Sequence, residues 1–437
     1  MLSTLRNAWK VPDLRKRLIF TLFMIAIFRM GNYIPVPGID TSKLANLTQN
    51  GSLFGFYDLI SGGAFSRFSI FAMGVVPYIN SSIIMQLLTI ALPSLESLSK
   101  EGEEGRKKIQ QYTRYGAVIL AVIQAFSTYA IIARAGALRD GSKLNLFIII
   151  ITVTTASTFL MWFGDKITEK GIGNGISLII FVNIVSRFPS TIYSIVGLQK
   201  AETVNFVEVI VFIVIALALF LLVVIMNLGE RRIPVQYAGR AVGNKIYKGQ
   251  STHIPINVNS SAVIGIIFAI SVMQFPITIG QFWPESAFYK FITLNQYSPF
   301  RDKSIAYIVL YFLLTVFFTW FYTVVTFKPD EMAENMHKSS GFIPGIRPGE
   351  PTAEYIERVI TKSSIIGGTF AAIIAVFPII MAAYSKFQGI SFGGTSMLIM
   401  VGFALDTIRQ IESQLVMRHY QGFLNKCLEM IMDAYNL

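Results

Sequence analysis

The sequence is poor in the residues that metal centres and disulfide-stabilised folds require. Cysteine occurs once, at Cys427, so neither a disulfide nor a thiolate metal site can form within the chain. The three histidines, His253, His337 and His419, fall in three different polar segments, which argues against a histidine cluster. We therefore expect no metal site and no other cofactor.

Charge is scarce as well. Only 14% of the 437 residues are charged and 53% are hydrophobic, a combination that is rare in a soluble domain of this length. The apolar residues come in blocks of roughly 20, about the length of helix that crosses the hydrocarbon core of a bilayer. The first block is long and has no small-x-small cleavage site, so we expect a retained span rather than a signal peptide. The composition predicts an all-α polytopic membrane protein.

The apolar blocks predict ten membrane-spanning helices. The expected ranges are 18–36, 73–92, 113–133, 145–163, 175–196, 205–227, 261–280, 304–327, 363–383 and 395–413. Ten spans place both termini on the same side, and most of the 37 basic residues fall on that side. The positive-inside rule therefore predicts that both termini are cytoplasmic.

Two of the expected cytoplasmic segments are too long to be simple turns. Residues 229–259 mix basic residues with alternating apolar ones, a pattern that favours a β-hairpin-like finger. Residues 328–362 contain two Pro-Gly turns before the start of an amphipathic helix. Solvated loops or contact with anionic lipid would explain part of this pattern. Both segments carry isolated basic residues on protruding loops shaped by glycine and proline. This pattern favours the interpretation that they are docking surfaces for a large partner.

Motifs for nucleotide and catalytic chemistry are missing. GRAVGNK (239–245) lacks the spacing of a phosphate-binding loop, and GIGNG (171–175) follows no βαβ pattern. HExxH does not occur, and GISFG (389–393), which matches GxSxG, lies between two expected spans and not after a predicted strand as a nucleophile elbow would, so an enzyme is not expected. Carboxylates avoid the centres of the expected spans, and Asp406 lies toward the cytoplasmic end of the last one. An ion-coupled transporter usually keeps ionisable residues near the middle of the membrane. The lack of such residues weakens the alternative of a ten-span secondary transporter but does not remove it.

The second and fifth spans carry stripes of aliphatic side chains, and polar side chains lie beside or near them. Val75, Ile79 and Ile83 share one helix face, as do Ile176 and Ile180. Core packing or lipid contact is the ordinary explanation of such stripes. Amides and hydroxyls accompany them at residues 80–82, Gln86, Gln124 and Asn259. Pairs of such groups contribute only about 0.6–2 kcal/mol between membrane helices, which suits either a seam that parts or static helix–helix contact.

Several segments together resemble the SecY family, the central subunits of bacterial protein-translocation channels. The segments are FRMGNYIPVPGID (28–40), SGGAFSRFSIFAMGVVPYI (61–79), KEGEEGRKKIQQYTRYG (100–116), GDKITEKGIGNGIS (164–177), QSTHIPINVN (250–259), SGFIPGIRPGEPTAEYI (340–356) and FGGTSMLI (392–399). They follow the order of the family and cover nearly the whole chain.

The resemblance implies two five-helix halves, related by inverted pseudo-symmetry, around an hourglass pore. The N-terminal half would span 1–196 and the C-terminal half 205–413, with a cytoplasmic tail at 414–437. A short plug helix would occupy about 53–69. The function implied is a channel for unfolded secretory polypeptides that also releases membrane segments sideways into the plasma membrane.

The resemblance also assigns roles to individual residues. The implied pore ring is Val75, Ile79, Ile176, Ile180, Ile267 and Ile399. The implied plug residues are Phe56, Leu59, Ile60, Gly62, Gly63 and Phe65. The implied lateral-gate polar cluster is Gln86, Gln124 and Asn259. The implied docking residues are Arg240, Lys245, Lys248 and Arg347.

The resemblance implies partners as well. They are the small membrane subunits SecE and SecG, the SecA motor ATPase, the translating ribosome, signal sequences with unfolded preproteins, and anionic lipids. The chain departs from the family in two places. Gly265 stands where proline is common in the seventh span, and the tail at 425–437 is less basic than usual.

Overall fold

A computed structural model shows a mainly helical chain. It describes residues 9–40, 61–134, 136–140, 142–200, 204–237, 240–242, 245–247, 251–259, 261–280, 286–295, 298–301, 304–384 and 394–435, together with Arg6 and Trp283. The chain divides into two compact units, Met1–Ser190 with Gly402–Leu437, and Thr191–Val401. The halves expected at 1–196 and 205–413 stay a prediction.

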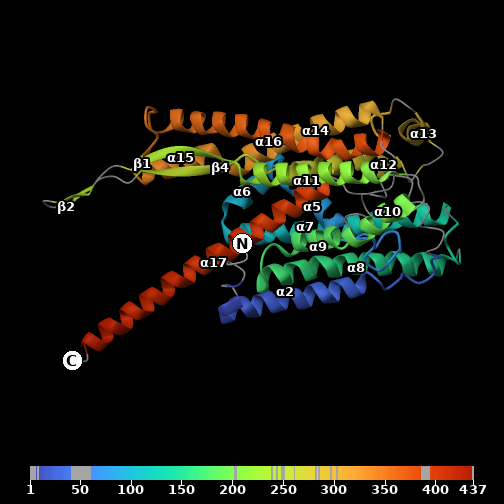
Figure 1. The fold of residues 1–437 in the computed structure, drawn as a ribbon, viewed down its shortest axis with the longest axis horizontal. Coiled ribbons are helices and arrows are strands. Elements are labelled where there is room, and N and C mark those ends of the chain that lie inside the picture. The colour runs from blue at the N-terminus through green and yellow to red at the C-terminus, as the bar shows by residue number, and fades with distance from the viewer. Residues whose placement is uncertain are drawn as a thin grey trace. The chain divides into compact units, whose positions relative to one another are not determined.

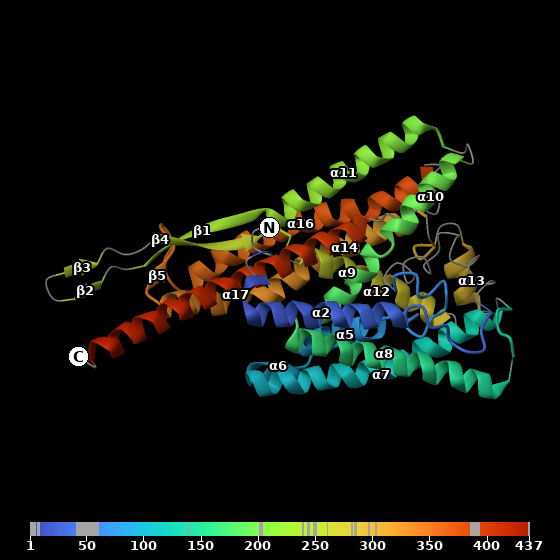
Figure 2. The same ribbon diagram turned by 60° about the horizontal axis from the view of Figure 1, so that its bottom comes forward.

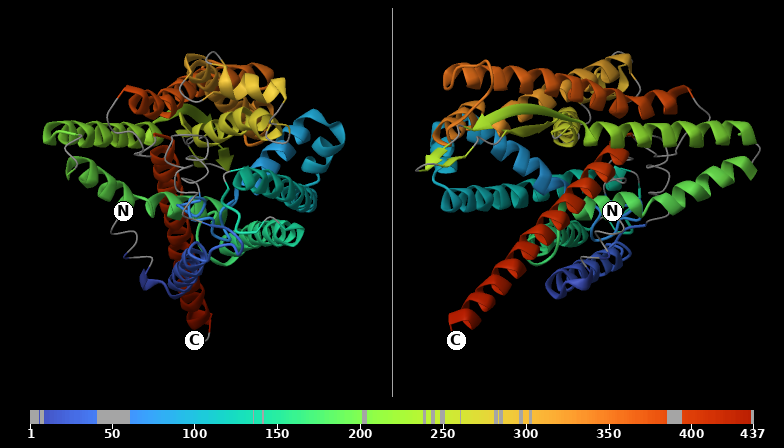
Figure 3. Two further views of the ribbon diagram at one scale, coloured as in Figure 1. Left: turned by 90° about the vertical axis from the view of Figure 1, so that its right-hand side faces the viewer. Right: turned by 60° about the vertical axis from the view of Figure 1, so that its left-hand side comes forward.

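The first unit is a set of helices that pack through small residues. Its elements are α2 (Pro12–Gly31), α5 (Val76–Ala91), α6 (Pro93–Lys100), α7 (Glu103–Arg134), α8 (Lys143–Lys170), α9 (Gly175–Val185) and the start of α10 (Phe188–Lys200). α5 lies along α7, and α7 lies along α8 (Figure 2, Figure 3). The second part of α17 (Gly394–Tyr435) belongs to this unit too.

The second unit combines helices with the β-structure of the chain. Its helices are α11 (Phe206–Leu228), α12 (Ala262–Gly280), α13 (Ala287–Leu294), α14 (Ile305–Phe327), α15 (Pro329–Lys338) and α16 (Glu350–Tyr384). α14 packs against both α12 and α16 (Figure 1). Two glycines permit this closeness, because a Cβ at Gly265 or Gly368 would lie 2.3 or 3.1 Å from side-chain atoms of Thr319.

The helices match the expected spans. Each expected range falls largely on one helix, or on α9 and α10 for the fifth. Among the described residues six helices are long and apolar enough to cross a bilayer, or seven if the bent pair α5 and α6 counts as one. α2 is not among the six, because any long window in it includes Arg15, Lys16, Arg17 and Arg29. The all-α polytopic fold is confirmed.

The β-hairpin expected at 229–259 is also confirmed. β1 (Glu230–Tyr237) pairs antiparallel with β4 (Ser251–Asn257), in a register that sets Arg232 opposite Pro255. β2 (Arg240–Val242) and β3 (Lys245–Tyr247) form the next part of the hairpin (Figure 2). β5 (Gly341–Phe342) adds to the other edge of β1, which makes the order β4-β1-β5. Pro255 removes one backbone donor from β4, an edge strand in the described sheet, as suits an edge that must not recruit further strands.

Some element boundaries differ from the sequence prediction. α2 begins at Pro12 and ends at Gly31 instead of spanning 18–36, because Pro35 and Pro37 follow closely and proline cannot continue a helix. α15 was not predicted, although Pro329 at its start, two acidic residues in its first turn and two basic residues in its last are standard signals. Within the expected plug helix, residues 61–69 form turns and one isolated bridge, and 53–60 lie outside the described residues.

Candidate functional site

Four of the six expected pore-ring residues lie in the first unit, at the starts of two helices. Val75 is the N-cap residue of α5, and Ile79 donates its backbone N–H to the Val75 carbonyl at 3.1 Å. Ile176 and Ile180 lie in the first two turns of α9. Val75 and Ile180 are buried, whereas Ile79 and Ile176 are half-buried.

The start of α9 is fixed by its neighbours. The Asn174 side chain accepts hydrogen bonds from the backbone N–H groups of Ile176 and Ser177, at 3.1 and 3.2 Å. A Cβ at Gly175 would lie 2.0 Å from the Gly164 carbonyl oxygen, so α9 starts in contact with the backbone of α8. The GIGNG segment, which the sequence excludes as a nucleotide site, is therefore the tight turn that positions Ile176.

The remaining two ring residues lie in the second unit. Ile267 is half-buried on α12, and Ile399 is buried near the start of α17. The common ring of six stays a prediction.

The expected plug residues divide into two groups. Phe56, Leu59 and Ile60 lie outside the described residues. Gly62, Gly63 and Phe65 belong to a turn-rich stretch, residues 61–74, which we call the root segment. Both glycines have left-handed backbone angles, with φ of +67° and +86°. Glycine adopts these angles without the steric cost that other residues meet.

The expected gate cluster has mixed surroundings. Gln86 is exposed on α5, and Gln124 is half-buried on α7. Asn259 is 3% exposed just before α12, and its side-chain amide has no hydrogen-bond partner within the described part of the chain. Buried amides of this kind are unusual, because an unpaired polar group costs free energy in a low-dielectric interior. The cluster stays a prediction.

One of the polar residues of α5 forms a helix–helix contact with α7. Ser81 is buried and donates to the Thr113 carbonyl of α7 at 2.7 Å. A Cβ at Gly116 would lie 2.5 Å from the Ser81 hydroxyl oxygen, so this glycine lets the two helices approach. Ser81 thus joins α5 to α7 within the first unit.

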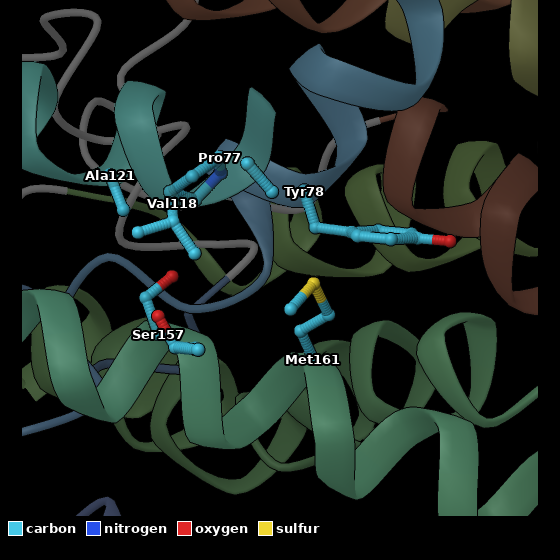
Figure 4. Close-up of a pocket in the computed structure, with 8 residues that line it drawn as sticks. Pro77, Tyr78, Val118, Ala121, Ser157 and Met161 are labelled. Carbon is cyan, nitrogen blue, oxygen red and sulfur yellow. The ribbon is translucent and has the colours of Figure 1, made fainter. Parts of the chain in front are cut away.

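A pocket lies inside the first unit between α5, α7 and α8. Figure 4 shows Pro77 and Tyr78 of α5 above Ser157 and Met161 of α8, with Val118 and Ala121 of α7 beside them. Small side chains on α7, including Ala117 and Ala121, leave this space. Close by, Arg114 of α7 pairs with Asp165 of α8 at 2.7 Å, an ion pair that the sequence did not reveal. α5, α7 and α8 therefore meet around this small pocket.

Arg29 lies in the last turn of α2. Its Nη1 donates to the Ser186 hydroxyl at 2.9 Å, and its guanidinium lies 5.8 Å from the centre of the Tyr33 ring. Arg67 lies over the same ring at 4.8 Å. Both guanidinium groups therefore lie within cation–π range of the Tyr33 ring.

The two expected docking segments form one folded body, which we call the docking platform. Its buried core takes residues from β1, β4, α15, the 341–349 loop and α16. The core residues are Ile233, Val235, Ile256, Met336, Ile343, Ile356 and Ile360. Figure 1 shows α15 alongside β1 and β4. No sequence pattern links residues 229–259 with 328–362, because their shared core depends on pairing across a long separation.

Arg347 lies exposed on this platform. Its loop is shaped by Gly345 and Gly349, whose φ angles are +84° and +99°, and its carbonyl accepts a 2.8 Å hydrogen bond from the Thr352 hydroxyl. Arg240 and Lys245 lie on β2 and β3. Lys248 lies outside the described residues. The side chain of Arg347 is thus presented on a loop held at both ends.

The comparisons with known proteins agree with one another. The family model described as SecY matches residues 69–408. The chain is 42% identical to the protein translocase subunit SecY of Streptomyces scabiei, over 97% of this chain and 100% of that protein. It is 41% identical to the Thermus thermophilus protein of the same name, over 98% of both chains.

Solved structures resemble the fold. A protein-conducting channel matches with a TM-score of 0.66 and 20% identity, over 92% of this chain and 93% of that one. Sec61 in a canine ribosome-channel complex from the endoplasmic reticulum matches with a TM-score of 0.62 and 20% identity, over the same shares. At this identity the likeness concerns the fold.

Proposed function

The chain belongs to the SecY family, and from this premise we propose how it carries polypeptides across and into a membrane. It is a protein-conducting, multi-pass membrane channel and not an enzyme. Our proposal adds its substrates, its seal, its driving partners and its orientation. The single observation that carries it is the match to protein translocase subunits over 97% of the chain.

The proposed substrates are unfolded secretory polypeptides, with lateral release of membrane segments into the plasma membrane. A selective solute site would need a few fixed polar contacts in a closed pocket. The positions proposed to surround the translocating chain are aliphatic instead, and such side chains accept any sequence. A ten-span secondary transporter is not supported by the family match.

The proposed seal is a ring of Val75, Ile79, Ile176, Ile180, Ile267 and Ile399. Aliphatic side chains offer water and ions no hydrogen bonds, so a narrow constriction of them dewets and blocks conduction. The idealised Born cost of stripping an ion of water is of order 20 kcal/mol. Flexible branched side chains can still spread around a passing polypeptide and close behind it.

The proposed gate is the seam at Gln86, Gln124 and Asn259. Weak amide pairs between membrane helices part at low cost, and the apolar helix of a signal sequence would take their place. The side chain of Asn259 is buried and has no hydrogen-bond partner within the described part of the chain, so it contributes no hydrogen bond to that part that would have to break when the seam opens.

The proposed driving partners dock on the docking platform. A motor ATPase of the SecA type or a translating ribosome would contact Arg347, Arg240, Lys245 and Lys248 through carboxylates or RNA phosphates. One relative in fold is a Sec61 channel in a ribosome complex, which supports ribosome docking here. Small subunits of the SecE and SecG type and anionic lipids complete the proposed assembly, with both termini cytoplasmic.

The experiment that tests this function is reconstitution in lipid vesicles. The chain with its small membrane subunits is combined with the motor ATPase, ATP and a preprotein, and protease-protected preprotein is measured. We expect protection that depends on ATP, on the motor and on the signal sequence. Uptake of small solutes without a motor, with no protected preprotein, would support a transporter instead.

A further inference from the structure

The root segment is buried although it has no regular secondary structure. Ser61, Ala64, Phe68 and Ser69 are each at most 3% exposed. Irregular backbone at membrane depth is tolerated only where protein surrounds it and satisfies its hydrogen bonds. The contacts that do this therefore determine whether the segment can move.

Backbone hydrogen bonds tie the root segment to the stretch that follows α2. Val36 donates its N–H to the Phe68 carbonyl at 3.0 Å, and Ile70 donates to the Ile34 carbonyl at 2.9 Å. Pro35 and Ser69 lie opposite each other as an antiparallel bridge between these two bonds. Residues 34–36 and 68–70 are thus paired through their backbones within the first unit.

Aromatic packing holds the other end of the root segment. The Phe71 ring stacks on Phe28 of α2 with 5.7 Å between ring centres, and on Phe159 of α8 at 6.3 Å. A Cβ at Gly31 would lie 2.1 Å from the Phe71 ring, so the ring sits directly on the backbone of α2. Ser157 of α8 donates to the Gly74 carbonyl at 3.0 Å. α2 and α8 together enclose residues 71–74.

A buried asparagine meets the N-terminal end of the root segment. Asn183 of α9 is 1% exposed, and its side-chain oxygen accepts a 3.2 Å hydrogen bond from the Asn32 amide. A Cβ at Gly62 would lie 2.6 Å from that same oxygen, so Gly62 packs directly on Asn183. Asn183 stands on the helix that carries Ile176 and Ile180. It therefore links the root segment to a helix of the proposed pore ring.

We propose that the root segment is a fixed anchor and that Asn183 is the positioning residue that latches it to α9. Residues 64–74 then stay in place during translocation, so Phe65, which the resemblance assigns to the plug, belongs to the fixed part of the chain. Moving these residues would break the paired backbone hydrogen bonds and uncover the Phe71 stack. The inference rests on the proposed function, because it concerns the plug of that channel.

A disulfide between residues 35 and 69 tests the fixed anchor. The bridge at Pro35 and Ser69 is a non-hydrogen-bonded pair, whose Cα atoms lie about 4.5 Å apart and within the range of a disulfide. Pro35→Cys and Ser69→Cys are combined in a chain with Cys427→Ser. Ile39→Cys with Leu138→Cys is the matched control, since this bridge has the same hydrogen-bond pattern and its cross-link joins residue 39 to residue 138 and not to the root segment, although both side chains share a hydrophobic core with Phe68.

We expect the oxidised 35–69 variant to protect preprotein in vesicles within about two-fold of its reduced form. Loss of translocation on oxidation, recovered by reductant and absent from the 39–138 control, would overturn the fixed anchor. If the Cys427→Ser chain itself protects no preprotein, the proposed function fails instead, so the two failures are distinguishable.

A second measurement tests the latch. Asn183→Leu removes the acceptor at similar volume, whereas Asn183→Asp keeps an oxygen in the same place. We expect Asn183→Leu to raise ion-conducting openings of the resting channel by roughly two- to ten-fold, the factor for one net hydrogen bond. Asn183→Asp should restore much of the seal. Equal resting conductance of the native and Leu channels would overturn the latch, and if the Leu variant fails to assemble, the 35–69 disulfide decides.

Discussion

Ile180 illustrates how much the surroundings of one side chain decide. It lies on α9 just after a start fixed by Asn174 and by the contact of Gly175 with Gly164. The side chain is 5% exposed, so the helix presents it to protein rather than to lipid. An apolar side chain on a helix whose start is fixed in this way suits a seal that must re-form after each passage.

Replacing Ile180 by asparagine should make the resting channel leak. The amide supplies hydrogen bonds to water at the constriction, which lowers the cost of wetting it. We expect Ile180→Asn to raise resting ion conductance in planar bilayers at least several-fold, and to let preproteins with defective signal sequences through. Ile180→Leu is the matched control and should stay tight. Equal conductance of the Asn and Leu variants would contradict the ring assignment.

Residue roles were only partly predictable from the sequence. The aliphatic stripes at 75–83 and 176–180 are visible as helical periodicity, and the resemblance gave them a role. Asn183 gave no such signal, because its partners Asn32 and Gly62 lie more than a hundred residues away. The same holds for Phe71, whose place on Gly31 depends on how α2 packs. Contacts of long sequence separation leave no trace in local pattern.

At the scale of elements, α12 and α14 approach each other so closely at Gly265 that a side chain there would collide with α14. Besides the Thr319 hydroxyl, the backbone N and Cα of Thr319 lie 2.8 and 2.9 Å from where a Cβ of Gly265 would stand. Gly265 also donates its N–H to the Ser261 carbonyl at 2.9 Å, a bond that proline could not make. In this chain α12 is therefore a continuous helix at 265, seated on α14.

Gly265→Ala should destabilise the second unit. Alanine favours the helix by about 1 kcal/mol, but backbone atoms cannot rotate away, and overpacking typically costs 1–3 kcal/mol. We expect a net loss, measured as a lower midpoint of thermal unfolding in detergent. Gly197→Ala is the control, since Gly197 lies in α10 with no atom within 4 Å of its would-be Cβ, and it should be neutral or stabilising. A Gly265→Ala midpoint equal to that of the control would refute the close seat.

Elements were more predictable than residues, for a physical reason. Long apolar blocks and the alternating finger at 229–259 carry strong local periodicity, and both appear as expected. α15 was not predicted, although Pro329 at its start and charged residues at both ends are helix signals. β5 is two residues long, which is too short for any periodicity, and it exists because β1 offers an edge.

At the scale of the whole molecule, the docking platform joins directly to membrane helices of the second unit. β1 follows α11 almost immediately, and β4 leads through Val258 and Asn259 into α12. Val258 donates to the Gly229 carbonyl at 3.1 Å, and a Cβ at Gly367 of α16 would lie 2.1 Å from the Val258 carbonyl oxygen. If a partner docks on the platform, its pull would reach α12 and α16 through these backbone contacts.

Reversing the charge of Arg347 should separate docking from channel assembly. Its loop is held by Thr352 and by two left-handed glycines, so the change alters the charge presented to a partner and leaves the buried core of the platform intact. We expect Arg347→Glu to lower ATP- and motor-dependent protection of preprotein by more than ten-fold. The amount of the chain in the membrane and its resting conductance should stay unchanged.

Arg358→Glu provides the control for this experiment. Arg358 is exposed on α16, in the same platform, and has no assigned contact with a partner, so the same charge change there tests for a general electrostatic effect. Charge around the platform attracts partners over about 10 Å at 0.1 M salt, so a long-range effect would weaken both variants alike and fade as salt rises. A specific contact predicts a loss at Arg347 that far exceeds the loss at Arg358 and persists at higher salt. If motor-driven export is normal in Arg347→Glu, or is equally reduced in both variants, the motor makes no specific contact with Arg347.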